Sequence, residues 1–402
     1  MIEMMFKDLK LIKIRNKLQN FYSKAKDLNW HIVFLHKSFK RFKLKQKSIK
    51  KGGDGLSTTK IRLTLFLSGL IVITSLLTAQ NSYAEVGIIN VYSAQKEALI
   101  RPLLERFEKQ TGIIFFLVTG TANGLLKRLE IEGDMTAADI FIADGANKLQ
   151  EAKVAGLLRA IHNPILEKRI PANLHDKDKF WFAISQRAHV LVYAKDRVKR
   201  EEISSYENLA DPKWKKRLCV SSATNISNQS LVASMIVENG EKTTEEWTKK
   251  LLKNSVTPQK GDDINQLKAV AAGTCDIALV NTNSLGEMIK SKESNEITKK
   301  LAIFWPNQGL KEPGVYINIS GAGITKYARH ARAAQRLLEF LITNESQKWY
   351  SETNNEYPVV PRSPVSATLK SFGNFKVDKL SQTIVGENNK KAVKLMNRIG
   401  WK

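Results

Sequence analysis

The chain has 402 residues, 43% of them hydrophobic, and a formal net charge of +25 at pH 7. Its length allows two domains, and its composition is that of a globular protein. Residues 1–84 carry 17 Lys and Arg against 4 Asp and Glu, so about half of the excess charge precedes the globular part. The basic residues accompany no helix-turn-helix, zinc or RNA-recognition signature, and we expect no nucleic-acid partner. The remaining charge favours anionic ligands by long-range attraction.

The N-terminal region contains an export signal. An almost wholly apolar run at 63–79 is followed by Ser82 and Ala84, the small residues that a signal peptidase reads, which predicts a signal peptide at 60–84 cleaved near Ala84. A membrane anchor is the alternative, because the run approaches the ~20 residues that span a bilayer. Residues 1–59 form a basic N-terminal extension, either upstream of a true start near Leu56 or an amphipathic cytoplasmic segment.

The chain contains two cysteines, Cys219 and Cys275, each at the edge of an apolar, strand-like run. An even number of cysteines in an exported chain allows one disulfide. Two small core hydrophobes are the alternative interpretation. The sequence leaves both open.

Strand and helix patterns alternate three times after the export signal. The expected strands are 86–92, 113–118 and 140–143, each followed by a helical pattern. This alternation predicts a parallel sheet covered by helices on both faces. Ligands of such sheets bind beyond the carboxyl ends of the strands. The residues expected there are Ser93, Thr119, Thr121 and Asp144.

A long β-rich run at 180–194 is interrupted by Gln186, Arg187 and His189. We interpret it as a segment that crosses from one lobe to another. The chain is expected to return through strands at 301–305 and 315–319, with Ser320 to Gly323 as a tight connection. Two crossings form a hinge. The predicted lobes are 85–186 with 305–402, and 187–304.

The stretch 275–286 organises the second lobe. An apolar strand at 277–280 ends in small polar residues that include Asn283 and Ser284, and residues 139–144 repeat this layout in the first lobe. Ser227 lies in a third polar stretch, at the junction between a strand and a helix. We expect these strand ends to face one ligand from both lobes.

Six short motifs together resemble the periplasmic ferric-ion-binding proteins that serve ABC importers. They are residues 89–97, 212–216, 228–234, 275–282, 318–323 and 386–389. The resemblance covers nearly all of residues 86–402. It implies an α/β fold, the type II-like two-lobed clamshell of periplasmic binding proteins with two parallel-rich sheets, and a periplasmic location.

The departures from the family pattern lie at the expected ligand site. The family commonly has adjacent tyrosines where this chain has Asn283 and Ser284, and another tyrosine where it has Ser227. Ferric ion prefers anionic oxygen, which an amide or hydroxyl does not supply. The metal-site candidates that the resemblance implies are therefore Asn283, Ser284, Ser227 and Asp144.

Arg187 matches an arginine that resembles an anion clamp in the family. Its alternative role is an interlobe salt bridge. Asp144 and Ser284 have the alternative role of helix caps. A clamp would favour iron(III) bound together with a synergistic anion.

The expected function is delivery of iron(III) or an iron chelate to an ABC permease in the inner membrane. The alternative is the same fold with the iron site lost, binding a small anion or another metal. An enzyme is not expected, because no Gly-x-Ser-x-Gly elbow is found. A monomer is expected.

Overall fold

The computed structural model describes residues 87–256 and 261–402. The contacts divide the chain into Met1–Tyr83 and Ala84–Lys402, and the described residues belong to the second unit. The predicted extension and signal peptide therefore lie outside the described residues. Within these residues, no helix combines the length and the apolar character that crossing a bilayer requires.

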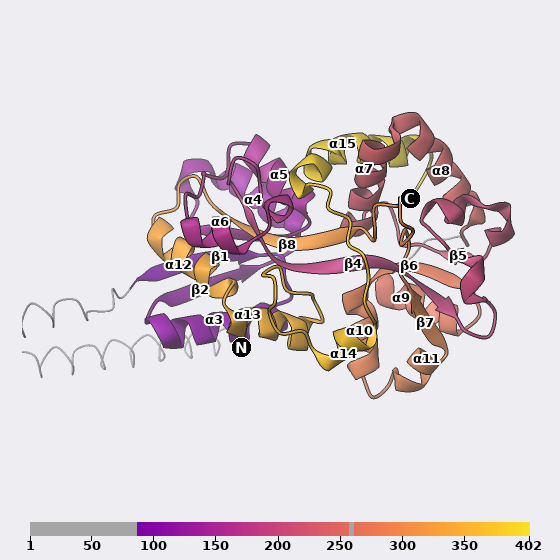
Figure 1. Cartoon of the computed structure of the whole chain (residues 1–402). Coiled ribbons are helices and arrows are strands. Elements are labelled where there is room, and N and C mark those ends of the chain that lie inside the picture. Colours follow the sequence, from indigo (N-terminus) through magenta and orange to yellow (C-terminus); the bar gives the residue numbers. More distant parts are fainter. Residues whose placement is uncertain (1–86, 257–260) are drawn as a thin grey trace, which may run out of the picture. The chain divides into compact units, whose positions relative to one another are not determined.

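The strands form one continuous sheet of eight strands (Figure 1). Its order is β2-β1-β3-β8-β4-β6-β5, and β7 pairs with β4 off this path. The strands are β1 (Ile88–Ser93), β2 (Ile114–Thr119), β3 (Ile140–Asp144), β4 (Phe182–Ala194), β5 (Leu218–Cys219), β6 (Ile277–Asn281), β7 (Leu301–Phe304) and β8 (Ile317–Ile324).

Helices lie on both sides of the strands (Figure 1). The earlier ones in the sequence are α3 (Glu97–Thr111), α4 (Ala122–Glu132), α5 (Ala146–Val154), α6 (Pro164–Arg169) and α7 (Ile226–Asn239). The later ones are α8 (Glu241–Asn254), α9 (Asp263–Ala271), α10 (Thr282–Lys290), α11 (Asn295–Lys299), α12 (Ala331–Leu341), α13 (Asn344–Trp349), α14 (Ala367–Ser371) and α15 (Gln382–Arg398). A π-helix, Tyr350–Asn354, continues α13.

The predicted parallel arrangement of the first three strands is confirmed. β1 pairs in parallel with β2 and with β3, and β5 pairs in parallel with β6. The pairs that involve β4 or β8 are antiparallel. The α/β class is therefore as expected. The strands form one sheet rather than the expected two parallel-rich sheets, because the crossing strands β4 and β8 pair antiparallel with both halves.

β4 is the segment that both halves of the sheet share. Its first part, from Phe182 to Ala188, pairs with β8, and its second part, from His189 to Ala194, pairs with β6 and β7. The predicted crossing segment is thus a single strand, with a register shift between Ala183 and Ser185. Its polar residues lie where the two halves meet.

The expected tight connection at residues 320–323 was wrong, because Ser320 to Gly323 lie inside β8. Close packing explains why glycine occupies positions 321 and 323. A Cβ on Gly321 would lie 3.0 Å from the backbone oxygen of Phe182, and one on Gly323 would lie 2.9 Å from that of Phe180. Glycine in this strand therefore permits close approach of β4 rather than a turn.

The last helix, α15, packs against α5 from the first part of the chain and against α7 from the later part. A Cβ on Gly386 of α15 would lie 2.8 Å from the Cβ of Gln150 in α5. Beyond α15, the Trp401 indole donates to the backbone oxygen of Ser221, next to β5. The lobe boundaries remain a prediction, and the C-terminal segment contacts both of the predicted lobes.

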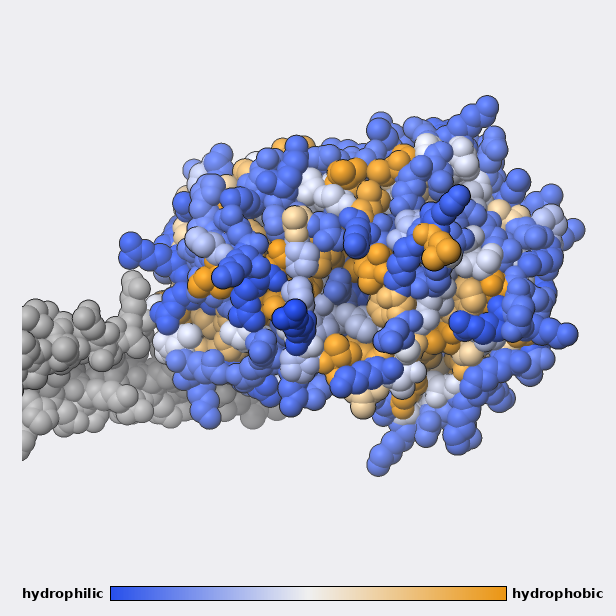
Figure 2. Space-filling model, viewed as in Figure 1, coloured by the Kyte–Doolittle hydropathy of each residue, from blue (hydrophilic) through white to orange (hydrophobic). Residues whose placement is uncertain are grey.

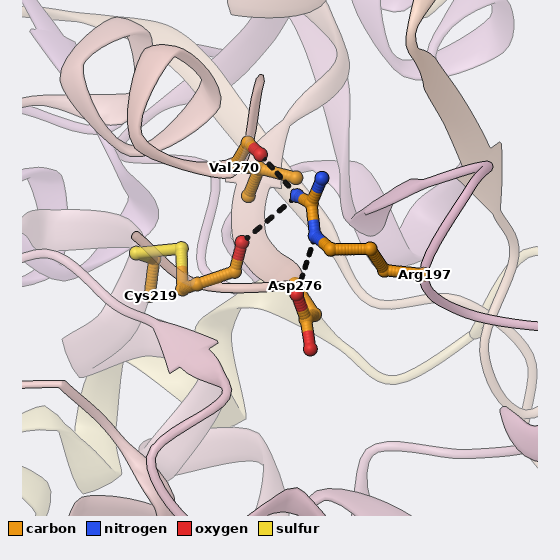
Figure 3. Close-up of a disulfide and its surroundings, with 5 residues drawn as sticks. Arg197, Cys219, Val270 and Asp276 are labelled. Carbon is orange, nitrogen blue, oxygen red and sulfur yellow. Dashed lines mark hydrogen bonds and ion pairs between the residues drawn. A yellow bond between two sulfur atoms is a disulfide. The ribbon is translucent and has the colours of Figure 1, made fainter. Parts of the chain in front are cut away.

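Cys219 and Cys275 form a disulfide, with their Cα atoms 5.8 Å apart. It joins the end of β5 to the segment that enters β6. Beside it, Arg197 donates to Asp276 Oδ1 at 2.7 Å and to the backbone oxygens of Val270 and Cys275 (Figure 3). Arg217 donates to Asp276 Oδ2 at 2.6 Å. These contacts fix the start of β6, and therefore the position of the polar residues at its end.

The face in Figure 2 is mostly hydrophilic, with apolar side chains gathered toward its middle. Most charged residues of the described part of the chain lie on the surface, where water solvates them. An exception is a small group of buried charged residues at the crossing of β4 and β8.

Candidate functional site

The crossing strands present one polar face. Side chains alternate along a strand, so Ser185, Arg187 and His189 of β4 share a face. Ser320 and Asn318 of β8 pair with Ser185 and Arg187. All five residues are buried, with exposed fractions of 7% or less. A buried polar face in the centre of the sheet requires hydrogen-bond partners, and two groups of residues supply them.

The first group surrounds the guanidinium of Arg187. Its Nη1 donates to Ser320 Oγ at 2.9 Å and to Glu356 Oε1 at 3.3 Å, and it lies 3.8 Å from Asp144 Oδ1. Ser320 Oγ donates to Asp144 Oδ1 at 2.7 Å. Ser185 Oγ donates to the other carboxylate oxygen of Glu356. Arg187 thus pairs with two carboxylates from the N- and C-terminal parts of the chain.

Glu356 is the unusual acid of this group. It follows the π-helix and is only 6% exposed. Burial raises the pKa of Glu356 to about 7, the Arg187 guanidinium works to lower it, and the neighbouring Asp144 carboxylate adds to the increase. Glu356 therefore exchanges a proton near neutral pH.

The second group surrounds Asn281, at the end of β6. The Asn281 side-chain amide donates to Ser227 Oγ at 3.0 Å and to Asp263 Oδ2 at 2.9 Å. The backbone amide of Asn281 donates to the same Asp263 oxygen at 2.8 Å. Asp263 begins α9 and is 6% exposed. Ser227 therefore faces the end of β6 from the first turn of α7.

Asn283 and Ser284 lie in the first turn of α10. Ser284 Oγ donates to Asp263 Oδ2 at a long 3.4 Å. Among the described residues, Asn283 Oδ1 has no hydrogen-bond partner although the atom is buried. Neither residue caps the helix, because the N-cap is Asn281. Ser284 therefore contacts the second group, and the side-chain oxygen of Asn283 is left without a partner in the described part of the chain.

Two hydrogen bonds join the second group to β8 and β4, the strands that carry Ser320 and Arg187 of the first group. Asn318 Nδ2 donates to Asn281 Oδ1 at 3.0 Å, and His189 Nδ1 lies 3.3 Å from the same oxygen. Burial lowers the pKa of His189, which keeps the imidazole neutral. The ring therefore adds no charge to the junction.

α10 runs alongside the π-helix and approaches Glu356. Lys290 donates to the backbone oxygen of Glu352, and a Cβ on Gly286 would lie 2.7 Å from the Cβ of Asn355. Asn283 lies one helical turn before Gly286 in α10. Glu287 of the same helix lies 3.6 Å from Lys96, which precedes α3.

The structure places the other predicted residues separately. Ser93 ends β1 and accepts from the backbone amide of Gln95 at 3.2 Å. Thr119 ends β2 and is exposed. Thr121 caps α4, where its Oγ1 accepts from the Gly124 amide at 3.1 Å. β2 is separated from β8 by β1 and β3, so the two threonines lie away from Arg187.

Asp144 does not cap the following helix, because Gly145 is the N-cap residue of α5. Its carboxylate instead contacts Ser320 and faces Arg187. The alternative role of Arg187, a salt bridge, is present with Glu356.

The buried tyrosines nearest this face are neutral phenols. Burial raises the pKa of Tyr316 and of Tyr350 above the ordinary value for tyrosine. In the described part of the chain, no group of three or more His, Cys, Asp and Glu side chains has the arrangement of a metal site. The donors at the junction are hydroxyls, carboxamides and separate carboxylates.

Sequence reasoning missed Glu356, Ser320, Asp263 and Asn318. Glu356 lies far from Arg187 in the sequence, and no local pattern marks it. Ser320 was assigned to a turn, and Asp263 to a loop. The alternation of polar residues at positions 318 and 320 was a signal that could have identified the two missed residues of β8.

A family model, described as bacterial extracellular solute-binding protein, matches residues 136–377. Iron uptake protein A1 of Synechocystis sp. is 37% identical to this chain, covering 78% of this chain and 87% of that protein. Iron uptake protein A2 of the same organism is 35% identical to this chain, and the match covers 86% of this chain and 99% of that protein.

Solved structures of similar proteins also match this chain. A Trichodesmium protein in complex with iron and citrate ligands has 41% identity and a TM-score of 0.75, covering 79% of this chain and 100% of that one. A ferric binding protein from Campylobacter jejuni has 37% identity and a TM-score of 0.75, and the match covers 78% of this chain and 100% of that one. The predicted clamshell fold is therefore confirmed.

Proposed function

Because this chain belongs to the bacterial extracellular solute-binding proteins, within the ferric-ion-binding branch, we propose that it captures iron(III) as a carboxylate chelate and delivers it to an ABC permease. The relatives named for iron uptake support iron as the transported ligand, and a relative solved with iron and citrate supports a chelate. The site would face the periplasm after cleavage near Ala84.

The observation that carries the proposal is the junction of the two polar groups. It combines one guanidinium, at Arg187, with oxygen-bearing side chains from both halves of the sheet. Ferric ion prefers hard, anionic oxygen ligands. Here Ser227, Asn283 and Ser284 offer neutral oxygens, which supply dipoles but no charge.

The chelator would therefore supply much of the negative charge around the metal. Asp144 is the carboxylate of the first group with the greater exposure, 35% for its side chain, and is the protein acid best placed to complete the shell. Arg187 would bind a carboxylate of the chelator as the synergistic anion. Ser93, Thr119 and Thr121 would contribute only if the sheet's outer edge approached the ligand.

The experiment is a titration of purified residues 85–402 with ferric citrate, followed by absorbance and by bound metal after gel filtration. We expect stoichiometric iron without a tyrosinate charge-transfer band, because the family's phenols are replaced. Citrate without iron, and gallium citrate, serve as comparison ligands. Retention of citrate alone with exclusion of iron would contradict the proposal and favour a small-anion carrier.

Two variants test the clamp. Arg187→Ala should weaken ferric citrate binding by at least tenfold, about 1.4 kcal/mol. Arg187→Lys keeps the charge but loses the planar fork, and an intermediate affinity is expected. Arg159→Ala is the control. Equal affinities in all four proteins would remove Arg187 from the binding site.

A further inference from the structure

The guanidinium of Arg187 already has an anionic partner inside the protein. Glu356 Oε1 lies 3.3 Å from Arg187 Nη1, and the exposed fractions of the two residues are 6% and 7%. Asp144 Oδ1 lies 3.8 Å from the same nitrogen atom of Arg187. An anionic group that binds to Arg187 therefore meets two carboxylates that compete for the same positive charge.

The charges of this group do not balance for an anionic ligand. One guanidinium and two carboxylates sum to a net negative charge. An anionic ligand would add further negative charge to this group. Like charges at short range disfavour each other, most strongly where burial excludes water. Binding becomes favourable when one carboxylate is neutralised.

Glu356 is the carboxylate that takes a proton most readily. Asp144 is more exposed, and the shift of the pKa to about 7 belongs to Glu356 and arises from its burial. The charged groups that face Glu356 are Arg187 on β4 and Asp144 on β3. The phenol of Tyr350 in the π-helix also faces it, but burial raises the pKa of that phenol and keeps it uncharged.

We propose that Glu356 takes up a proton from solvent when the anionic part of the ligand binds to Arg187, so that anion and proton bind together. The proton adds to a carboxylate oxygen of Glu356. The ligand's oxygen then replaces that carboxylate as the charged partner of the guanidinium. This inference rests on the proposed function, because it requires an anionic group of the chelate at Arg187.

The consequence is a pH dependence with a defined sign. The pKa of Glu356 is about 7 without ligand and rises when the ligand's negative charge arrives. Proton uptake therefore accompanies binding, and affinity falls as the pH rises. For an unliganded pKa near 7, linkage gives about a tenfold weaker affinity at pH 8 than at pH 6.

The test is calorimetric titration of residues 85–402 with ferric citrate from pH 6 to pH 8. At pH 7.5 the titration is run in HEPES and in Tris, whose different protonation enthalpies reveal the protons taken up. The same titrations on Glu356→Gln, which keeps the shape but cannot ionise, are expected to show no proton uptake by the protein and only the pH slope that ferric citrate itself contributes. They should also show tighter binding than the wild type at pH 8.

Glu130→Gln is the matched control, because Glu130 is an exposed acid paired with Lys127 on α4. It should behave as the wild type does, and subtraction of Glu356→Gln removes the titration of ferric citrate itself. Thermal unfolding without ligand checks that each variant is folded. The same proton uptake and pH slope in the wild type and in Glu356→Gln would overturn the inference. Failure of the folded wild type to bind at any pH would instead overturn the proposed function.

Discussion

Asn318 donates a hydrogen bond to Asn281 at 3.0 Å, and this contact joins the end of β6 to the crossing strand β8. Asn281 also donates to Ser227 and Asp263 and lies 3.3 Å from His189 Nδ1, so one carboxamide organises four partners. The positions of Asn283 and Ser284, which follow directly in α10, depend on this arrangement.

Replacing Asn281 should therefore destabilise the protein and the site together. Asn281→Ala removes the donor to Ser227 and one donor to the buried Asp263, and we expect a loss of about 2 kcal/mol in the free energy of unfolding, because a buried group loses a partner. Urea unfolding followed by circular dichroism measures the loss. Asn239→Ala, at an exposed residue, is the control and should stay within about 0.5 kcal/mol of the wild type. An equal effect of the two substitutions would show that the Asn281 contacts are dispensable.

Returning phenols to α10 should change the colour of the protein. Asn283→Tyr with Ser284→Tyr places tyrosines where the family pattern has them, and we expect a visible charge-transfer band with iron(III). Iron affinity should rise at least tenfold, about 1.4 kcal/mol, because phenolate adds anionic oxygen. The paired substitution Asn283→Phe with Ser284→Phe controls for ring size. A colourless double-tyrosine variant that retains iron would place the metal away from α10.

Asp276 gives the protein a predictable acid sensitivity. Its partial burial works to raise the pKa, but the hydrogen bonds from Arg217 and Arg197 outweigh burial and hold the pKa below the ordinary value. A lowered pKa stabilises the fold at pH values above the pKa of unfolded aspartate, about 3.9. That stability is lost as the pH falls through the lower, folded pKa.

Asp276→Asn should therefore be less stable than the wild type at pH 7, and the difference should shrink below about pH 4. Thermal unfolding from pH 3 to pH 7 measures it. Asp196→Asn, an exposed neighbour that also contacts Arg197, is the control. A difference between Asp276→Asn and wild type that does not change with pH would contradict the ionic account of this contact (Figure 3).

The disulfide should contribute substantially to stability. It closes a sequence separation of 56 residues, for which chain entropy gives about 4 kcal/mol. Substituting both Cys219 and Cys275 by Ala should lower the unfolding midpoint without changing the fold, since both sites are buried and accept a small residue. Dithiothreitol should destabilise the wild type and leave the double variant unchanged. An identical response of both proteins would show that the bond contributes nothing.

The local parts of the fold were predictable from the sequence. Apolar runs that alternate with helical patterns identified β1, β2 and β3, and the polar residues at 186, 187 and 189 marked the crossing, because such residues are unusual in a buried strand. The end of β6 was predictable for a similar reason. Its apolar run stops at Asn281, where small polar residues begin.

The remaining parts depend on contacts between distant segments. Glu356 reaches Arg187 from a segment that follows the π-helix, and no pattern near either residue predicts the pair. The run from Ser320 to Gly323 resembled a turn, because two glycines close together are typical of turns. Here the glycines instead allow close packing against the segment that forms β4. The cysteine pair was open until the positions of β5 and β6 were known.

The most direct test of the account is equilibrium dialysis of residues 85–402 against ferric citrate in which both the iron and the citrate are labelled. The account predicts that the protein retains the two together, and that Arg187→Ala loses both. Retention of iron without citrate by the wild type, or loss of citrate alone in the variant, would contradict the claim that this protein carries iron(III) as a chelate held at Arg187.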